Sequence, residues 1–107
     1  MRTYAVRANK EEKNLYYILF MHDMADENNT FFRIANLLEK SYKSEFDNIS
    51  FWPLKTDNEV LESNVSVKNH SPNFFFLKKT DKEQWEHYVD VLLCDHYTIT
   101  TDETVIV

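Results

Sequence analysis

Glycine is absent from the 107 residues of this chain, and proline occurs only twice. Glycine adopts positive φ without steric cost and lets a backbone approach a phosphate group closely. Phosphate-binding loops, dinucleotide fingerprints and glycine-rich nucleotide covers are therefore excluded. We expect the turns to use Asn and Asp, which tolerate left-handed φ best among the remaining residues.

Cysteine is nearly absent as well. The single Cys94 cannot form an internal disulfide, which fits a reducing compartment and excludes a disulfide-stapled secreted scaffold. The longest apolar run, residues 15–21, is far shorter than the roughly 20 residues of a membrane span. These features predict a cytoplasmic protein without a membrane segment.

Aromatic residues are abundant, with 8 Phe, 6 Tyr and 2 Trp. Their large apolar areas favour a folded core despite the 28% of charged residues. A chain of this length buries roughly 60–65% of the surface that it exposes when unfolded. We expect residues 1–107 to form a single α+β domain.

The first half of the chain predicts a hairpin followed by a helix. Residues 3–8 and 15–21 are rich in β-branched and aromatic residues, and the second run is apolar throughout, which indicates a central strand covered on both faces. Asp26 or Asn29 can cap a helix that runs to about Glu45. Its apolar stripe consists of Phe31, Ile34, Ala35, Leu38 and Tyr42.

The second half predicts two strands, a helix and a strand-forming tail. Residues 49–54 and 73–78 have strand composition, and Pro53 indicates an edge or an end. Thr80 and Glu83 match a capping box, which places the second helix from about residue 81 to residue 95. We expect residues 98–100 and 104–107 to be extended.

From residue 15 onward the order is therefore strand, helix, strand, strand, helix, strand. This order predicts a mostly antiparallel sheet with two helices packed on one face, in the ferredoxin-like split βαβ arrangement with an extra N-terminal strand. Other α+β sandwiches with the same element order remain open.

Acidic residues are concentrated at the end of the chain. Residues 1–80 carry equal numbers of acidic and basic residues, so the net charge of −6 belongs to residues 81–107. That segment has one basic residue, Lys82, and seven acidic ones: Asp81, Glu83, Glu86, Asp90, Asp95, Asp102 and Glu103.

Helical periodicity separates the two sides of the second helix. Trp85, Tyr88, Val89 and Leu92 fall on the side expected to pack, while the acids fall on the other side without a basic neighbour. An acidic face can simply keep a domain soluble, or it can steer a basic protein partner. We expect the following acids to contact such a partner: Glu83, Glu86, Asp90, Asp102, Glu103, Asp23 and Asp26.

A small acidic domain without catalytic motifs suits the task of blocking a basic active site. Immunity proteins against toxins such as nucleases, and phage inhibitors of host defence or nucleic-acid machines, follow this physical logic. The sequence therefore predicts an inhibitor or antitoxin that binds a basic protein, with no enzymatic activity, cofactor, metal or direct contact with nucleic acid. Its oligomeric state is left open.

Three alternatives remain. The segment YYILFMHDMADENN, residues 16–29, is similar to the strand-plus-acid pattern of ferredoxin-like metal nucleases, which implies a homodimer that uses Asp23, although the basic residues for phosphate are lacking. Cys94 and His96 are zinc-ligand types, but they point in different directions at a helix end. A third reading is a non-catalytic subunit of a larger assembly that pairs through an edge strand such as residues 104–107.

Two aromatic groups, residues 51–52 and 74–76, resemble the base-stacking sheet of RNA-recognition modules only in composition, because the glycine of that signature is absent. We expect most of these rings in the core. An exposed member would indicate a protein interface.

Overall fold

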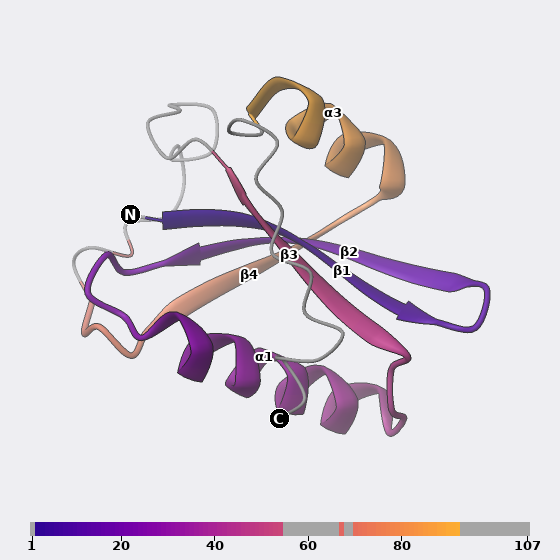
Figure 1. The fold of residues 1–107 in the computed structure, drawn as a ribbon, viewed down its shortest axis with the longest axis horizontal. Coiled ribbons are helices and arrows are strands. Elements are labelled where there is room, and N and C mark those ends of the chain that lie inside the picture. Colours follow the sequence, from indigo (N-terminus) through magenta and orange to yellow (C-terminus); the bar gives the residue numbers. More distant parts are fainter. Residues whose placement is uncertain (1, 55–66, 68–69, 93–107) are drawn as a thin grey trace.

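The computed structural model describes residues 2–54, 67 and 70–92, with side chains as far as residue 87 in the last helix. The described residues form an α+β fold with a four-stranded antiparallel sheet and two helices (Figure 1). Its elements are β1 (Arg2–Lys10), β2 (Lys13–Met21), α1 (Glu27–Tyr42), β3 (Asn48–Leu54), β4 (Phe75–Thr80) and α3 (Lys82–Leu92). Neither helix is long and apolar enough, over the residues described, to span a membrane.

The strands lie in the order β3-β1-β2-β4. β1 and β2 form a hairpin whose register runs from Arg2 opposite Met21 to Lys10 opposite Lys13. β3 is antiparallel to β1 on its other side, so β2 and β3 are parallel to each other and β1 lies between them. The unit β2–α1–β3 is therefore a split βαβ unit, with β1 as the inserted strand.

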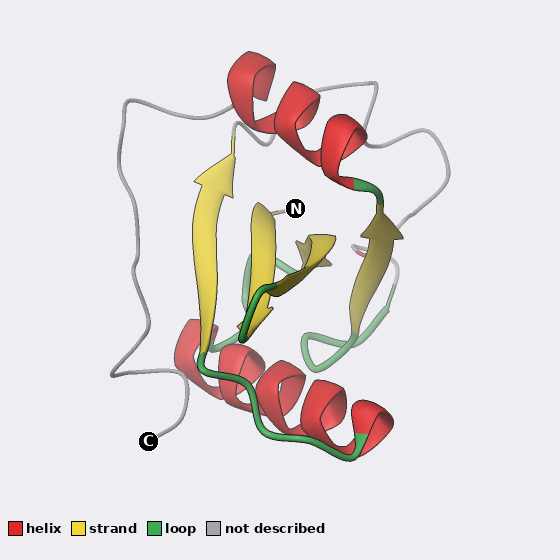
Figure 2. Cartoon of the chain, turned by 90° about the vertical axis from the view of Figure 1, so that its right-hand side faces the viewer, coloured by secondary structure: helices red, strands yellow, loops and turns green. Residues whose placement is uncertain are grey.

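The two helices lie on opposite faces of the sheet (Figure 2). Tyr4 and Leu19 belong to the core cluster that contains α1, whereas Ala5 and Ile18, their neighbours in sequence, belong to the cluster that contains Trp85 of α3. The prediction that both helices pack on one face is therefore wrong. β2, which contains the apolar run 15–21, is central as predicted, and each of its two buried faces meets its own helix.

The ferredoxin-like arrangement in particular is not confirmed. β1, rather than β4, occupies the position between β2 and β3. The predicted strands at residues 98–100 and 104–107 lie outside the described residues.

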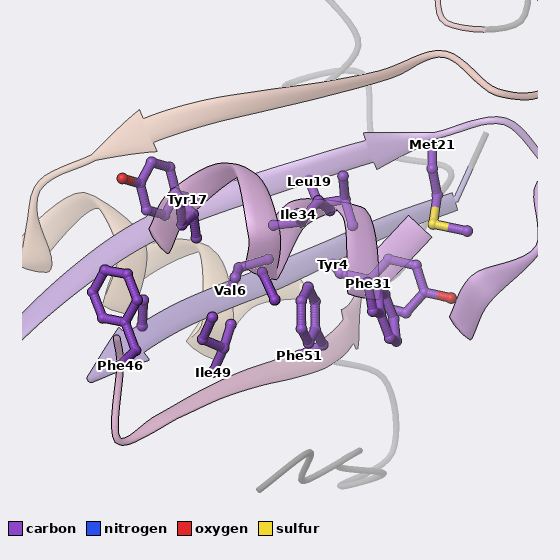
Figure 3. Close-up of a cluster of buried hydrophobic side chains, with 13 residues drawn as sticks. Tyr4, Val6, Tyr17, Leu19, Met21, Phe31, Ile34, Phe46, Ile49 and Phe51 are labelled. Atoms are coloured by element: carbon purple, nitrogen blue, oxygen red, sulfur yellow. The ribbon is translucent and has the colours of Figure 1, made fainter. Parts of the chain in front are cut away.

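The larger core lies between α1 and the sheet (Figure 3). Phe31 stacks on Phe51 with ring centroids 3.9 Å apart and meets Tyr4 edge-on at 5.2 Å. Four members of the predicted stripe are buried, whereas Tyr42 is 41% exposed. Aromatic pairs prefer specific ring geometries and contribute stabilising energy beyond that of the apolar area they bury. These contacts therefore fix how α1 crosses the sheet.

Both ends of α1 have identifiable caps. The Asp26 carboxylate accepts a hydrogen bond of 2.8 Å from the Asn29 backbone N–H, which confirms Asp26 as the N-cap. The helix ends at Tyr42, earlier than expected, because Lys43 adopts the left-handed conformation with φ 52°. The other positive-φ residue among those described is Glu11, so the expectation that Asn and Asp fill these positions is wrong there.

α3 is capped by Asp81. Its carboxylate accepts a hydrogen bond of 2.8 Å from the Gln84 backbone N–H, and the helix begins at Lys82. The predicted cap, Thr80, is the last residue of β4 and is paired with Tyr16. Its buried hydroxyl has no hydrogen-bond partner in the described part of the chain. The strand pleat, rather than the capping-box pattern, sets the direction of this side chain.

Candidate functional site

Trp85 fixes the orientation of α3 on the sheet. Its side chain is 7% exposed, and its indole N–H donates a hydrogen bond of 3.2 Å to the backbone carbonyl of Tyr17. The ring also packs at 5.2 Å from Tyr16 and at 5.5 Å from Trp52. A helix anchored through one face presents the opposite face to solvent.

The exposed side of α3 carries the predicted acids. We define the α3 acidic surface as Asp81, Glu83 and Glu86, which are all exposed. Asp90 lies in the same helix, in its part without described side chains, and Asp102 and Glu103 lie outside the described residues. The structure thus brings together three of the acids in residues 81–107.

The electrostatics of this surface differ from the sequence expectation in one respect. Lys82 lies 3.9 Å from Glu86, one turn along the helix, so the surface has a basic neighbour. Both side chains are exposed, and pairs of this kind contribute little, about 0.3–0.5 kcal/mol. Glu83 lies in the first turn, where a carboxylate interacts favourably with the helix dipole.

Asp23 and Asp26 are not part of the α3 acidic surface. They lie in the connection from β2 to α1, and α1 packs on the sheet face opposite to α3. Asp26 caps α1, and Asp23 is exposed. The acids predicted for one partner surface therefore fall into two separate places.

The loop before α1 is held by a local network. The Arg2 guanidinium donates to the His22 carbonyl at 3.3 Å and to the Ala25 carbonyl, and it lies 3.8 Å from the Glu27 carboxylate. Glu27 also accepts a hydrogen bond from the Tyr4 hydroxyl. Arg2 and Glu27 therefore have a structural role in the loop region that contains Asp23.

A metal site in this loop has no support from the geometry. His22 Nδ1 accepts a hydrogen bond of 3.0 Å from the Met24 backbone N–H. Within residues 2–54, 67 and 70–92, no three His, Cys, Asp or Glu side chains gather closely enough to hold a metal ion. The zinc-ligand types at Cys94 and His96 lie outside those residues.

Three tyrosines near α1 have shifted pKa values. Burial, followed by the hydrogen bond to Glu27, raises the pKa of Tyr4 well above its ordinary value. Burial also raises the pKa of Tyr17, whose hydroxyl lies 3.2 Å from that of Tyr42. The hydrogen bond from Tyr17 lowers the pKa of Tyr42, and Lys79 acts in the same direction.

The expectation that most of the aromatic rings at residues 51–52 and 74–76 lie in the core is met only in part, because Trp52, Phe74 and Phe75 are half-buried. Phe51 is buried and Trp52 is half-buried against Trp85. Phe76 is 39% exposed, and its ring lies 6.0 Å from that of Phe20 on the α3 side of the sheet. The exposed member of the second group is therefore on β4.

A basic surface along β4 was missed by sequence reasoning. Arg33 of α1 lies over the Phe75 ring at 5.0 Å and donates to the Asn73 carbonyl at 2.8 Å. Farther along, the Lys79 ammonium lies 3.3 Å from the Tyr42 hydroxyl. Residues 1–80 have equal numbers of acidic and basic residues, so their composition does not indicate a basic surface. Arg33 and Lys79 are far apart in the sequence, and only the fold brings them to one flank.

Comparisons of this chain with protein-family models, with curated proteins and with solved structures find no match.

Proposed function

We propose that this chain is a small binding protein that neutralises a basic protein partner through the α3 acidic surface. The observation that carries the proposal is the division of α3, in which Trp85 is buried and Glu83 and Glu86 are exposed. An anchored helix fixes the backbone positions from which its outer carboxylates project. A basic partner then meets a preorganised surface, which reduces the ordering that binding requires.

Such a surface raises the association rate of the partner more than it raises the affinity. Complementary charge accelerates encounter and suppresses partners of the wrong charge. The partner class is a basic protein that itself binds nucleic acid, because such proteins carry the Lys and Arg clusters that phosphates require. Toxin immunity and inhibition of a defence machine both demand this chemistry, and both belong to the proposal.

The proposed role is non-catalytic and cytoplasmic, and it uses no cofactor. The local partners of Asp26 and Glu27 support the non-catalytic part of the proposal, because these carboxylates, which follow Asp23 in the sequence, already serve the cap of α1 and the Arg2 network. Asp90, Asp102 and Glu103 extend the proposed contact along the chain. Asp23 and Asp26 contribute as a second acidic place, on the α1 side of the protein.

The proposal is tested by affinity capture with three baits: the wild type, a Glu83→Lys, Glu86→Lys variant and a Glu12→Lys, Glu45→Lys control. The control makes the same charge change at exposed positions on the β1–β2 turn and after α1. Source-cell lysate is applied at low and moderate salt, and retained proteins are identified by mass spectrometry. Thermal unfolding of each bait verifies its fold.

We expect one basic protein to be retained by the wild type and by the control, and lost by the α3 variant. Retention should weaken in moderate salt because attraction between exposed charges more than about 10 Å apart is largely screened at 0.1 M salt. Equal retention of that protein by the α3 variant would contradict the proposal.

A further inference from the structure

β4 forms one border of the sheet in the described part of the chain. β4 pairs with β2 along residues 75–80, and no described strand pairs with its other edge. The opposite border of the sheet, β3, contains Pro53, which lacks the N–H needed for strand pairing. β4 has no proline, so alternate residues offer both backbone N–H and C=O groups outward.

The side chains of β4 divide into an apolar half and a basic half. Phe75, Phe76 and Leu77 are followed by Lys78 and Lys79. On the α1 side, Phe75 and Leu77 pack partly against the core. On the α3 side, Phe76 is exposed beside Phe20. Both lysines are exposed.

α1 extends this division beyond the strand. Arg33 lies over Phe75, and Leu37, one turn later on the same flank, is 51% exposed. Tyr42 lies beneath Lys79, with the ammonium 5.9 Å from the ring centroid. Contacts of this kind hold a cation in place while leaving part of its charge toward solvent.

The charges favour one occupant over another. A second copy paired in parallel and in register would place its own Lys78 and Lys79 beside these lysines, and like charges at facing positions are destabilising. Lysines on an edge commonly serve to prevent such self-pairing. A strand with carboxylates at the facing positions would instead form attractive cross-strand charge pairs with the same lysines.

We propose that β4 is a docking edge for an extended acidic segment of a partner protein, which adds as a fifth strand to the described sheet. In the antiparallel orientation the segment has two consecutive acidic residues, opposite Lys79 and Lys78, followed by three apolar or β-branched residues opposite 77, 76 and 75. Main-chain hydrogen bonds supply the general attraction, and the acids set the register. This edge is distinct from the α3 acidic surface and attracts the opposite charge.

The test uses two labelled peptides that differ only in charge, with cores Glu-Glu-Val-Tyr-Val and Lys-Lys-Val-Tyr-Val. Binding to the full chain is measured by fluorescence anisotropy, and the contact is mapped by amide chemical shifts of the ¹⁵N-labelled protein. The Lys78→Glu, Lys79→Glu variant reverses the edge charge. Lys10→Glu, Lys13→Glu is the matched control at the far end of the β1–β2 hairpin.

We expect the wild type and the control to bind the acidic peptide about tenfold more tightly than the basic one, since two cross-strand charge pairs replace two repulsions. The reversed variant should prefer the basic peptide, and shifts should concentrate at residues 75–80. Equal binding of both peptides, absence of binding, or an unchanged preference in the reversed variant would overturn the proposal. Sedimentation that shows a β4-dependent dimer would also overturn it, because the occupant would then be a second copy.

The outcome is separable from the proposed function. Glu83→Lys, Glu86→Lys should leave the preference for the acidic peptide at β4 intact. A failure at β4 therefore leaves the α3 acidic surface standing, and a failure at α3 leaves the β4 edge standing.

Discussion

Tyr4 joins β1 to the start of α1. It is buried in the core beneath α1, its ring meets Phe31, and its hydroxyl donates to Glu27, which also lies near Arg2. Nothing in the sequence pattern pairs Tyr4 with Glu27, because they are 23 positions apart and the hairpin alone brings them together. Residue-level partners across elements depend on register, which hydrophobic patterning specifies only in part.

The raised pKa of Tyr4 predicts a loss of stability in alkali. Below about pH 10 the phenol is neutral in both folded and unfolded chains. Above this pH the unfolded chain releases the proton more readily, so the free energy of unfolding falls as pH rises, by up to about 1.4 kcal/mol per pH unit for one group. Urea unfolding from pH 8 to 11 measures this slope.

Two variants identify the group responsible. Tyr4→Phe should flatten the alkaline slope, and Glu27→Gln should flatten it partially, because a carboxylate that opposes the phenolate is removed while burial remains. Tyr17, which is also buried, leaves a residual slope in both variants. Identical slopes in the wild type and Tyr4→Phe would show that Tyr4 does not contribute.

The start of α3 shows why a local pattern can mislead. Thr80 and Glu83 satisfy the capping-box spacing, yet Asp81 is the cap because Thr80 still belongs to β4. We predict that Asp81→Ala lowers the free energy of unfolding by about 1 kcal/mol. Thr80→Val should leave it unchanged or raise it, since the buried hydroxyl has no hydrogen-bond partner among the residues described. Urea unfolding that ranks the two variants in the reverse order would contradict this assignment.

At the scale of elements, the hydrophobic periodicity of α1 located the helix and its buried face. The C-terminus was misplaced because no glycine marks it, and Lys43 takes the left-handed position instead. For a residue with a Cβ atom this conformation costs roughly 1–2 kcal/mol. The chain accepts that cost here, where the Lys43 N–H bonds to the Glu39 carbonyl.

A matched glycine pair tests this reading. Lys43→Gly should raise the free energy of unfolding by about 0.5–1 kcal/mol, because glycine adopts positive φ freely. Lys40→Gly, which removes the same charge from the last turn of the helix, should lower it by about 1 kcal/mol. Differential scanning calorimetry of both variants decides the matter, and destabilisation by Lys43→Gly would refute the left-handed assignment.

The sequence also predicted which segments form strands, but it did not predict the order of the strands in the sheet. β1, β2 and β3 lie within two residues of the expected ranges, and β4 is shifted by two. The placement of β1 between β2 and β3 depends on long-range pairing that each strand alone leaves undetermined. The apolar run of β2 indicated cover on both faces, and this was the signal that the helices lie on opposite sides.

At the scale of the whole molecule, the described sheet separates two surfaces of opposite character. The α3 acidic surface lies over one face, and the basic flank formed by Arg33 and Lys79 lies along the α1 side of β4. Sequence reasoning found the first because its acids are close together in the sequence. It missed the second because distant residues form it, and it assigned Asp23 and Asp26 to the same partner contact as the α3 acids although they belong to the α1 side.

The central claim is that the carboxylates of α3 steer a basic partner. The most direct measurement is the association rate of the captured partner with the wild type, with Glu83→Lys, Glu86→Lys and with Glu12→Lys, Glu45→Lys, followed by biosensor over a range of salt. We predict that the α3 variant associates about tenfold more slowly at low salt, that the control matches the wild type, and that added salt removes the difference. Equal rates for the α3 variant and the wild type at low salt would contradict the claim.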